Sequence, residues 1–139
     1  MNDTTRLRAI VYIAKEIDEL FEQFFETAEM PPVWSPALDL FVSDSKVHLM
    51  FAVPGVRAED MEVRIGPRSV VVRGTKAVPA SVRQGVSFYE SELPYGPFEK
   101  RVALPAPVLP QSYRVGFADG VLTLELERAA TGVRMIRVE

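Results

Sequence analysis

The chain has 139 residues, of which 47% are hydrophobic and 25% charged, and it contains no cysteine and one histidine. That length suits one domain of about 100 residues with short extensions. The absence of cysteine excludes disulfides, thiolate catalysis and iron–sulfur clusters, and one histidine cannot build a multi-histidine metal centre. Because neither a secretory signal nor a membrane-spanning run is recognisable, we expect a cytoplasmic location.

The formal net charge of −3 is unevenly distributed. Residues 1–33 carry three basic and seven acidic side chains, a balance of −4, whereas residues 34–139 carry 13 basic and 12 acidic ones, a balance of +1. A nucleic-acid-binding surface needs clustered lysine and arginine on one face. We therefore expect no nucleic-acid partner.

Before Pro31-Pro32, apolar residues follow the spacing of an amphipathic helix. This pattern predicts helix through the first 30 residues, with an apolar stripe of Ile10, Ile13, Ala14, Ile17, Leu20, Phe21, Phe24, Phe25 and Ala28. Basic residues near its start and acidic residues near its end oppose the helix dipole, so the segment needs a partner. Its own domain, a second subunit and an unfolded client protein all fit that role.

After the proline pair the apolar period changes to two, which is typical of β-strands. The predicted strands are 38–42, 46–53, 61–65, 69–73, 98–104, 113–117 and 121–127, with a shorter strand-like piece at 86–90 inside an irregular stretch, 75–96. Pro54-Gly55 predicts a type II turn and Asp119-Gly120 a two-residue hairpin. Seven or eight short strands in about 95 residues predict a β-sandwich.

The sequence carries little that resembles catalytic chemistry. It has no glycine-rich phosphate loop, and His48 lies on the polar face of its strand. The acidic residues Glu16, Asp18, Glu19 and Glu22 have no matched basic partner, so a solvated helix face is the better interpretation. We expect a protein that is not an enzyme and needs no cofactor or metal.

Several stretches read together resemble the α-crystallin domain of small heat-shock proteins of the bacterial, archaeal and plant type. They are Trp34–Asp39, Val53–Val56 with Glu59–Val63, Val70–Gly74, Tyr95–Pro105, the Phe117–Leu124 hairpin with its Gly-Val-Leu, and a terminal Ile136-Arg137-Val138. The resemblance spans about residues 34–138. It implies an all-β, immunoglobulin-like two-sheet sandwich over 34–128, an N-terminal helical arm over 1–33 and a C-terminal extension over 129–139.

The function implied by this resemblance is an ATP-independent chaperone, a holdase that binds partly unfolded clients and self-associates into dimers and larger homo-oligomers. The arm residues Ile10, Ile13, Ile17, Leu20, Phe21, Phe24 and Phe25 would bind clients. The tail residues Ile136 and Val138 would dock in a groove lined by Met61, Val63, Ile65, Tyr113, Val115 and Phe117. A dimer interface would include Phe88, Tyr89, Glu90, Lys100 and Arg101.

Two positions depart from the family pattern. Lys100 stands where the family usually has arginine, and lysine cannot form a bidentate pair with a carboxylate. Gly116 stands where alanine is usual.

The main alternative to the chaperone function is a monomeric binding module of the CS-domain co-chaperone kind, acting on one defined partner. A third class, a peripheral membrane protein, is disfavoured because an arm of charge −4 is repelled by anionic lipid.

Overall fold

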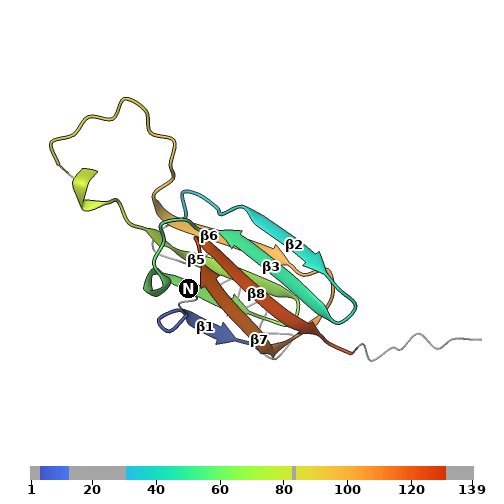
Figure 1. Ribbon diagram of the computed structural model, residues 1–139. Coiled ribbons are helices and arrows are strands. Elements are labelled where there is room, and N and C mark those ends of the chain that lie inside the picture. The colour runs from blue at the N-terminus through green and yellow to red at the C-terminus, as the bar shows by residue number, and fades with distance from the viewer. Residues whose placement is uncertain (1–3, 13–30, 83, 131–139) are drawn as a thin grey trace, which may run out of the picture.

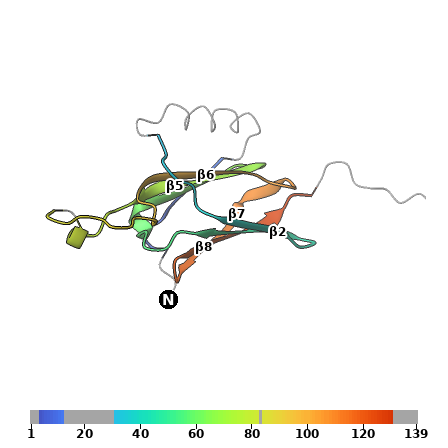
Figure 2. The same ribbon diagram turned by 90° about the horizontal axis from the view of Figure 1, so that it is seen from above.

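The computed structural model describes residues 4–12, 31–82 and 84–130. These residues form a sandwich of two four-stranded sheets, seen stacked edge-on in Figure 2. The strands are β1 (Arg8–Val11), β2 (Leu38–Val42), β3 (Lys46–Ala52), β4 (Met61–Ile65), β5 (Ser69–Lys76), β6 (Gly96–Ala103), β7 (Val108–Ala118) and β8 (Val121–Arg128). Two short 3-10 turns complete the elements, η1 (Ala58–Asp60) and η2 (Ala80–Val82).

Sheet A has the strand order β1-β4-β5-β6, and sheet B has the order β2-β3-β8-β7 (Figure 1). All pairings are antiparallel except that of β1 with β4, which is parallel. The predicted two-sheet sandwich is therefore confirmed. Seven predicted strands are present, with β5 extending three residues further and β7 beginning five residues earlier than expected.

The core lies between the sheets and follows the predicted alternation. Its inward residues include Val47, Leu49 and Phe51 of β3, which are fully buried. Sixteen buried side chains form one continuous apolar cluster, and Trp34, Leu38 and Leu40 pack against its margin. The alternation of apolar and polar residues predicted which face of each strand is buried, because successive side chains of a strand point to opposite sides of a sheet.

The two predicted turns, at Pro54-Gly55 and at Asp119-Gly120, adopt the predicted geometry. Asp119 and Gly120 both have positive φ, 54° and 76°, as a type I′ hairpin requires. Gly55 has a φ of 81° at the third position of its turn, and the Val56 N–H donates to the Val53 carbonyl at 3.2 Å.

Two expectations are corrected. Arg8–Val11 form a β-strand, so the helical prediction is wrong for these residues; residues 13–30 lie outside the described residues. Val86–Glu90 form no strand, since they pair with no strand of the described part of the chain. The eighth strand of the sandwich is thus β1 and not the strand-like piece of the loop.

Candidate interaction surfaces

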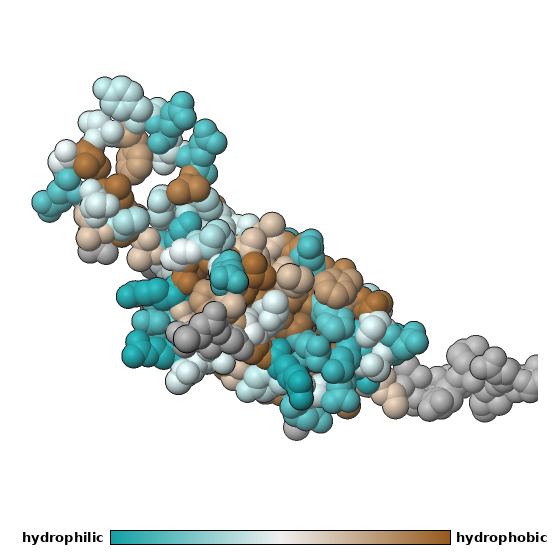
Figure 3. All heavy atoms as spheres, viewed as in Figure 1, coloured by the Kyte–Doolittle hydropathy of each residue, from teal (hydrophilic) through white to brown (hydrophobic). Residues whose placement is uncertain are grey.

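The loop between β5 and β6 projects from one end of the sandwich (Figure 1). It exposes Phe88 by 58%, Tyr89 by 95% and Leu93 by 64%, and Figure 3 shows hydrophobic residues interspersed with hydrophilic ones on this loop. Large aromatic side chains are costly to leave in water. The loop therefore presents an apolar surface that the single chain leaves uncovered.

The base of this loop is anchored where it joins the sheets. Lys76, the last residue of β5, is only 8% exposed, and its Nζ lies 5.2 Å from the centroid of the Tyr95 ring. A desolvated ammonium over an aromatic face is attracted to its π electrons. This contact joins the two ends of the loop while its tip stays exposed.

The β2 edge of sheet B is the second surface. Among the described residues β2 pairs only with β3, so its outer backbone groups are available to another strand. Phe41 and Val42 on β2 are about half exposed, and the Phe41 ring stacks on the imidazole of His48 with centroids 4.9 Å apart. A shallow cavity of about 330 Å³ lies beside this pair on the outer sheet face.

The same outer face of sheet B carries a small charge cluster. Lys46 Nζ lies 2.8 Å from Glu125 Oε1, and His48 Nδ1 lies 3.7 Å from Glu125 Oε2. The hydrogen bond from Lys46 is the largest effect that holds the pKa of the Glu125 carboxyl below its ordinary value. These three side chains are between a quarter and two fifths exposed, and pairs this open to solvent contribute little to stability.

The predicted tail-docking residues lie on two facing strands. Met61, Val63 and Ile65 of β4 are buried in the core, whereas Tyr113 is 39% exposed and Val115 and Phe117 are half-buried on β7. The structure thus brings these six residues to one side of the sandwich. The backbone edge of β4, however, already pairs with β1.

The predicted dimer-interface residues fall in two places. Phe88, Tyr89 and Glu90 are exposed on the loop, while Lys100 and Arg101 are on β6. Arg101 Nε donates to Glu99 Oε1 at 2.9 Å on the exposed face of that strand. Within one chain the two groups therefore belong to separate elements.

Of the arm residues predicted to bind clients, Ile10 alone lies within the described residues. It is half-buried in β1. The other six, Ile13, Ile17, Leu20, Phe21, Phe24 and Phe25, lie outside them, as do Ile136 and Val138. Ile10 therefore contributes to a sheet edge and not to a helical stripe.

The strand β1 is the element beside the candidate groove that the sequence analysis missed. One side of the strand carries Leu7, Ala9 and Val11, and the other carries Arg8 and Ile10. The run Ile10-Val11-Tyr12 also favours a strand, because its side chains are β-branched or aromatic. This signal is only a few residues long and overlaps the start of the helical pattern, which concealed it.

Residues 4–12, 31–82 and 84–130 contain no cluster of three or more side chains of the metal-ligating kinds. Across the same ranges, no helix is both long and apolar enough to cross a bilayer. The surfaces described above are apolar strand edges and loops, which are suited to binding other polypeptides.

The fold defines a class of protein, the two-sheet β-sandwich with a long loop projecting from one end. The model of the Hsp20/alpha crystallin family matches residues 39–139, and the chain belongs to this family. The small heat-shock proteins of this family are chaperones that form oligomers and bind clients, and they are not enzymes. The predicted family is confirmed.

Individual relatives agree with this assignment. The chain is 23% identical over 120 residues to small heat shock protein C4 of Rickettsia felis, covering 81% of this chain and 73% of that one. A small heat-shock protein structure from Xylella fastidiosa is 29% identical, with a TM-score of 0.60 over 76% of this chain and 97% of that chain. Heat shock protein 16.0 from Schizosaccharomyces pombe shares the fold, with a TM-score of 0.63 at 21% identity over 76% and 98% of the two chains.

Proposed function

We propose that this chain is an ATP-independent holdase that works in the cytoplasm without a cofactor, binds partly unfolded proteins and limits their aggregation. The observation that carries the proposal is the combination of a rigid sandwich with apolar segments that the single chain leaves uncovered. Membership of a chaperone family supports the same function. Binding by apolar area, without a catalytic site, requires no nucleotide.

The loop is proposed to form the dimer. Phe88-Tyr89-Glu90 would add as a strand to the β2 edge of a second copy, because strand addition satisfies the backbone groups of both segments. In sheet A the β4 edge is paired with β1, and the β6 edge is bridged to Trp34 at Phe98, so the β2 edge of sheet B is the better candidate. Lys100 and Arg101 are proposed to border this interface.

The C-terminal extension is proposed to link dimers. Ile136 and Val138 would enter the groove between β4 and β7, each contributing about 1.5–3 kcal/mol before ordering costs. One such contact is weak, but many contacts in one assembly act together. This arrangement favours oligomers that exchange subunits.

The arm is proposed to bind clients through its apolar residues. Phe21, Phe24 and Phe25 supply large apolar areas at the helical spacing that places them on one side. Such a surface selects partners by exposed apolar area more than by sequence, which suits partly unfolded chains of many kinds.

Substitutions in the arm test this proposal. Phe21→Ser, Phe24→Ser and Phe25→Ser together remove apolar area but leave residues 4–12 intact, so β1 stays in place. We expect this variant to lose most suppression of aggregation of a heated test protein, measured by turbidity without nucleotide. The matched control is Glu19→Gln, Glu22→Gln and Glu26→Gln in the same segment, which should retain suppression. Full suppression by the serine variant, or a requirement for ATP, would reject the proposal.

A further inference from the structure

The strand β1 occupies the edge of β4 that the proposed tail docking needs. Arg8 pairs with Glu62 and Val11 with Ile65 in a parallel register, and the Tyr12 N–H donates to the Ile65 carbonyl at 2.8 Å. β1 is the outermost strand of sheet A, so it is joined to the sheet on one side only. The chain's own N-terminal segment thus covers this edge.

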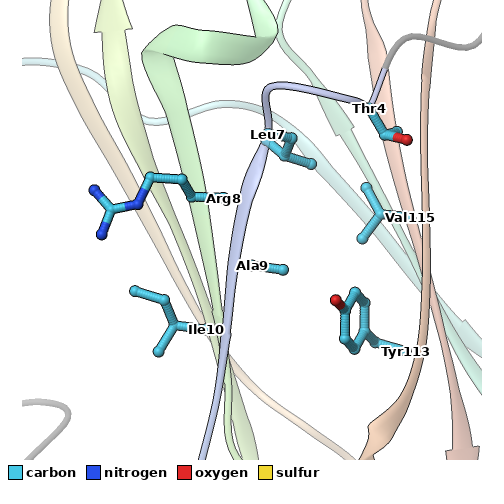
Figure 4. Close-up of a pocket in the computed structure, with 7 residues that line it drawn as sticks. All are labelled: Thr4, Leu7, Arg8, Ala9, Ile10, Tyr113 and Val115. Carbon is cyan, nitrogen blue, oxygen red and sulfur yellow. The ribbon is translucent and has the colours of Figure 1, made fainter.

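The side chains of β1 fill the groove only in part. Figure 4 shows Leu7 and Ala9 directed toward Val115 and Tyr113 of β7, while Arg8 and Ile10 point away. Leu7 packs against the core, but beside the single methyl of Ala9 lies a cavity of about 480 Å³. A larger side chain at this position would gain contacts that alanine cannot make.

The outward side chains add polar contacts. Arg8 Nη1 lies 3.8 Å from Glu62 Oε1, and Arg64 Nη1 donates to the Tyr12 hydroxyl at 2.8 Å. The Arg8–Glu62 pair is exposed at Arg8 and contributes little to stability. The attachment of β1 comes mainly from four residues of backbone pairing, from Leu7 and Val11 against the core, and from the part-buried Tyr12 beside Val71. So short a strand at a sheet edge suits a reversible contact.

The sequence of the tail repeats the pattern of β1. Leu7-Arg8-Ala9 and Ile136-Arg137-Val138 are both apolar, basic, apolar. The pattern is symmetric about its arginine, so Arg137 can face Glu62 in place of Arg8 whichever way the tail runs along the edge. In either direction a branched side chain replaces Ala9 beside the cavity.

We propose that β1 and the Ile136-Arg137-Val138 segment of a neighbouring copy bind the β4 edge alternately. This inference rests on the proposed tail docking and adds its regulation. The tail has the larger apolar area, whereas β1 has the advantage of being tethered beside its site. When the tail replaces β1, the arm stays joined to the sandwich only on the Trp34 side, so assembly and release of the client-binding arm are coupled.

Peptide binding to the full-length chain tests this competition. The background chain carries Ile136→Ala and Val138→Ala, so that its own tails leave the groove, and the probe is a fluorescent peptide of residues 130–139. Adding Leu7→Asp should release β1 from the β4 edge and tighten peptide binding by at least about tenfold. The reason is that the state with an uncovered β4 edge, which alone can bind the peptide, is then fully populated. Adding Ala9→Val should bury two more methyl groups against the wall of the cavity, strengthen β1 and weaken peptide binding by about fivefold.

A matched control changes an exposed residue just before the strand. Arg6→Gln, whose side chain is 72% exposed and does not line the cavity, should leave peptide affinity at the background value. Equal affinity for the background, Leu7→Asp and Ala9→Val chains would overturn the competition while leaving tail docking intact. Absence of binding to all of them would overturn tail docking itself, and the competition with it.

Discussion

At the scale of single residues, Gly74 is a position where the fold leaves no room for a side chain. A Cβ there would lie 2.3 Å from the Asp60 carbonyl oxygen and 2.8 Å from the Phe98 ring. Both neighbours are fixed, the first in the η1 turn and the second in the core. Glycine is required here by close backbone approach and not by its φ angle.

Gly74→Ala should therefore lower the free energy of unfolding by about 1–3 kcal/mol through overpacking. The neighbouring Thr75 is exposed, so Thr75→Ala is the control and should change stability by less than about 0.5 kcal/mol. Urea denaturation followed by circular dichroism measures both. Equal stability of Gly74→Ala and the unmodified protein would show that β5 can move away from η1.

Other residues differ in how far the sequence could predict them. The left-handed conformation of Asp119 and Gly120 was predictable because turn chemistry is local. The burial of Lys76 was not, because it depends on Tyr95, which returns to the same place after a long loop. Local rules predict local geometry, and contacts between distant residues need the fold.

At the scale of elements, β1 shows why a strong periodic pattern can mislead. The spacing of Ile10, Ile13 and Ile17 favours helix, but the exposed edge of β4 offers backbone partners to any short extended segment. Tertiary context overrides propensity at such an edge. Seven strands were predictable because each carries several alternating positions, whereas β1 is four residues long.

The loop between β5 and β6 gives a prediction at the same scale. Phe88→Ser with Tyr89→Ser removes the aromatic area proposed to pair with a second copy, so this variant should sediment as monomers. Leu93→Ser is the control, because Leu93 is 64% exposed in the same loop but outside the proposed pairing segment. A double variant that still forms dimers would place the dimer contact elsewhere, for example on sheet edges alone.

At the scale of the whole molecule, the sandwich could be predicted by counting alternating segments, but its interaction surfaces could only be predicted in part. Phe88 and Tyr89 were identifiable as unplaced aromatics in an irregular stretch, and the structure leaves them exposed. Their partner cannot be read from one chain, because a surface that binds another copy is complete only in the assembly. The pairing of β1 with the β4 edge also required the three-dimensional arrangement.

We propose that this chain acts as an assembly of copies joined through its loop and sheet edges. The most direct test is the molar mass of the full-length protein, measured by multi-angle light scattering over a range of concentrations. We predict a mass several times that of one chain, falling toward smaller species on dilution as subunits exchange. A mass of one chain at every concentration would contradict this assembly and favour a monomeric binding module.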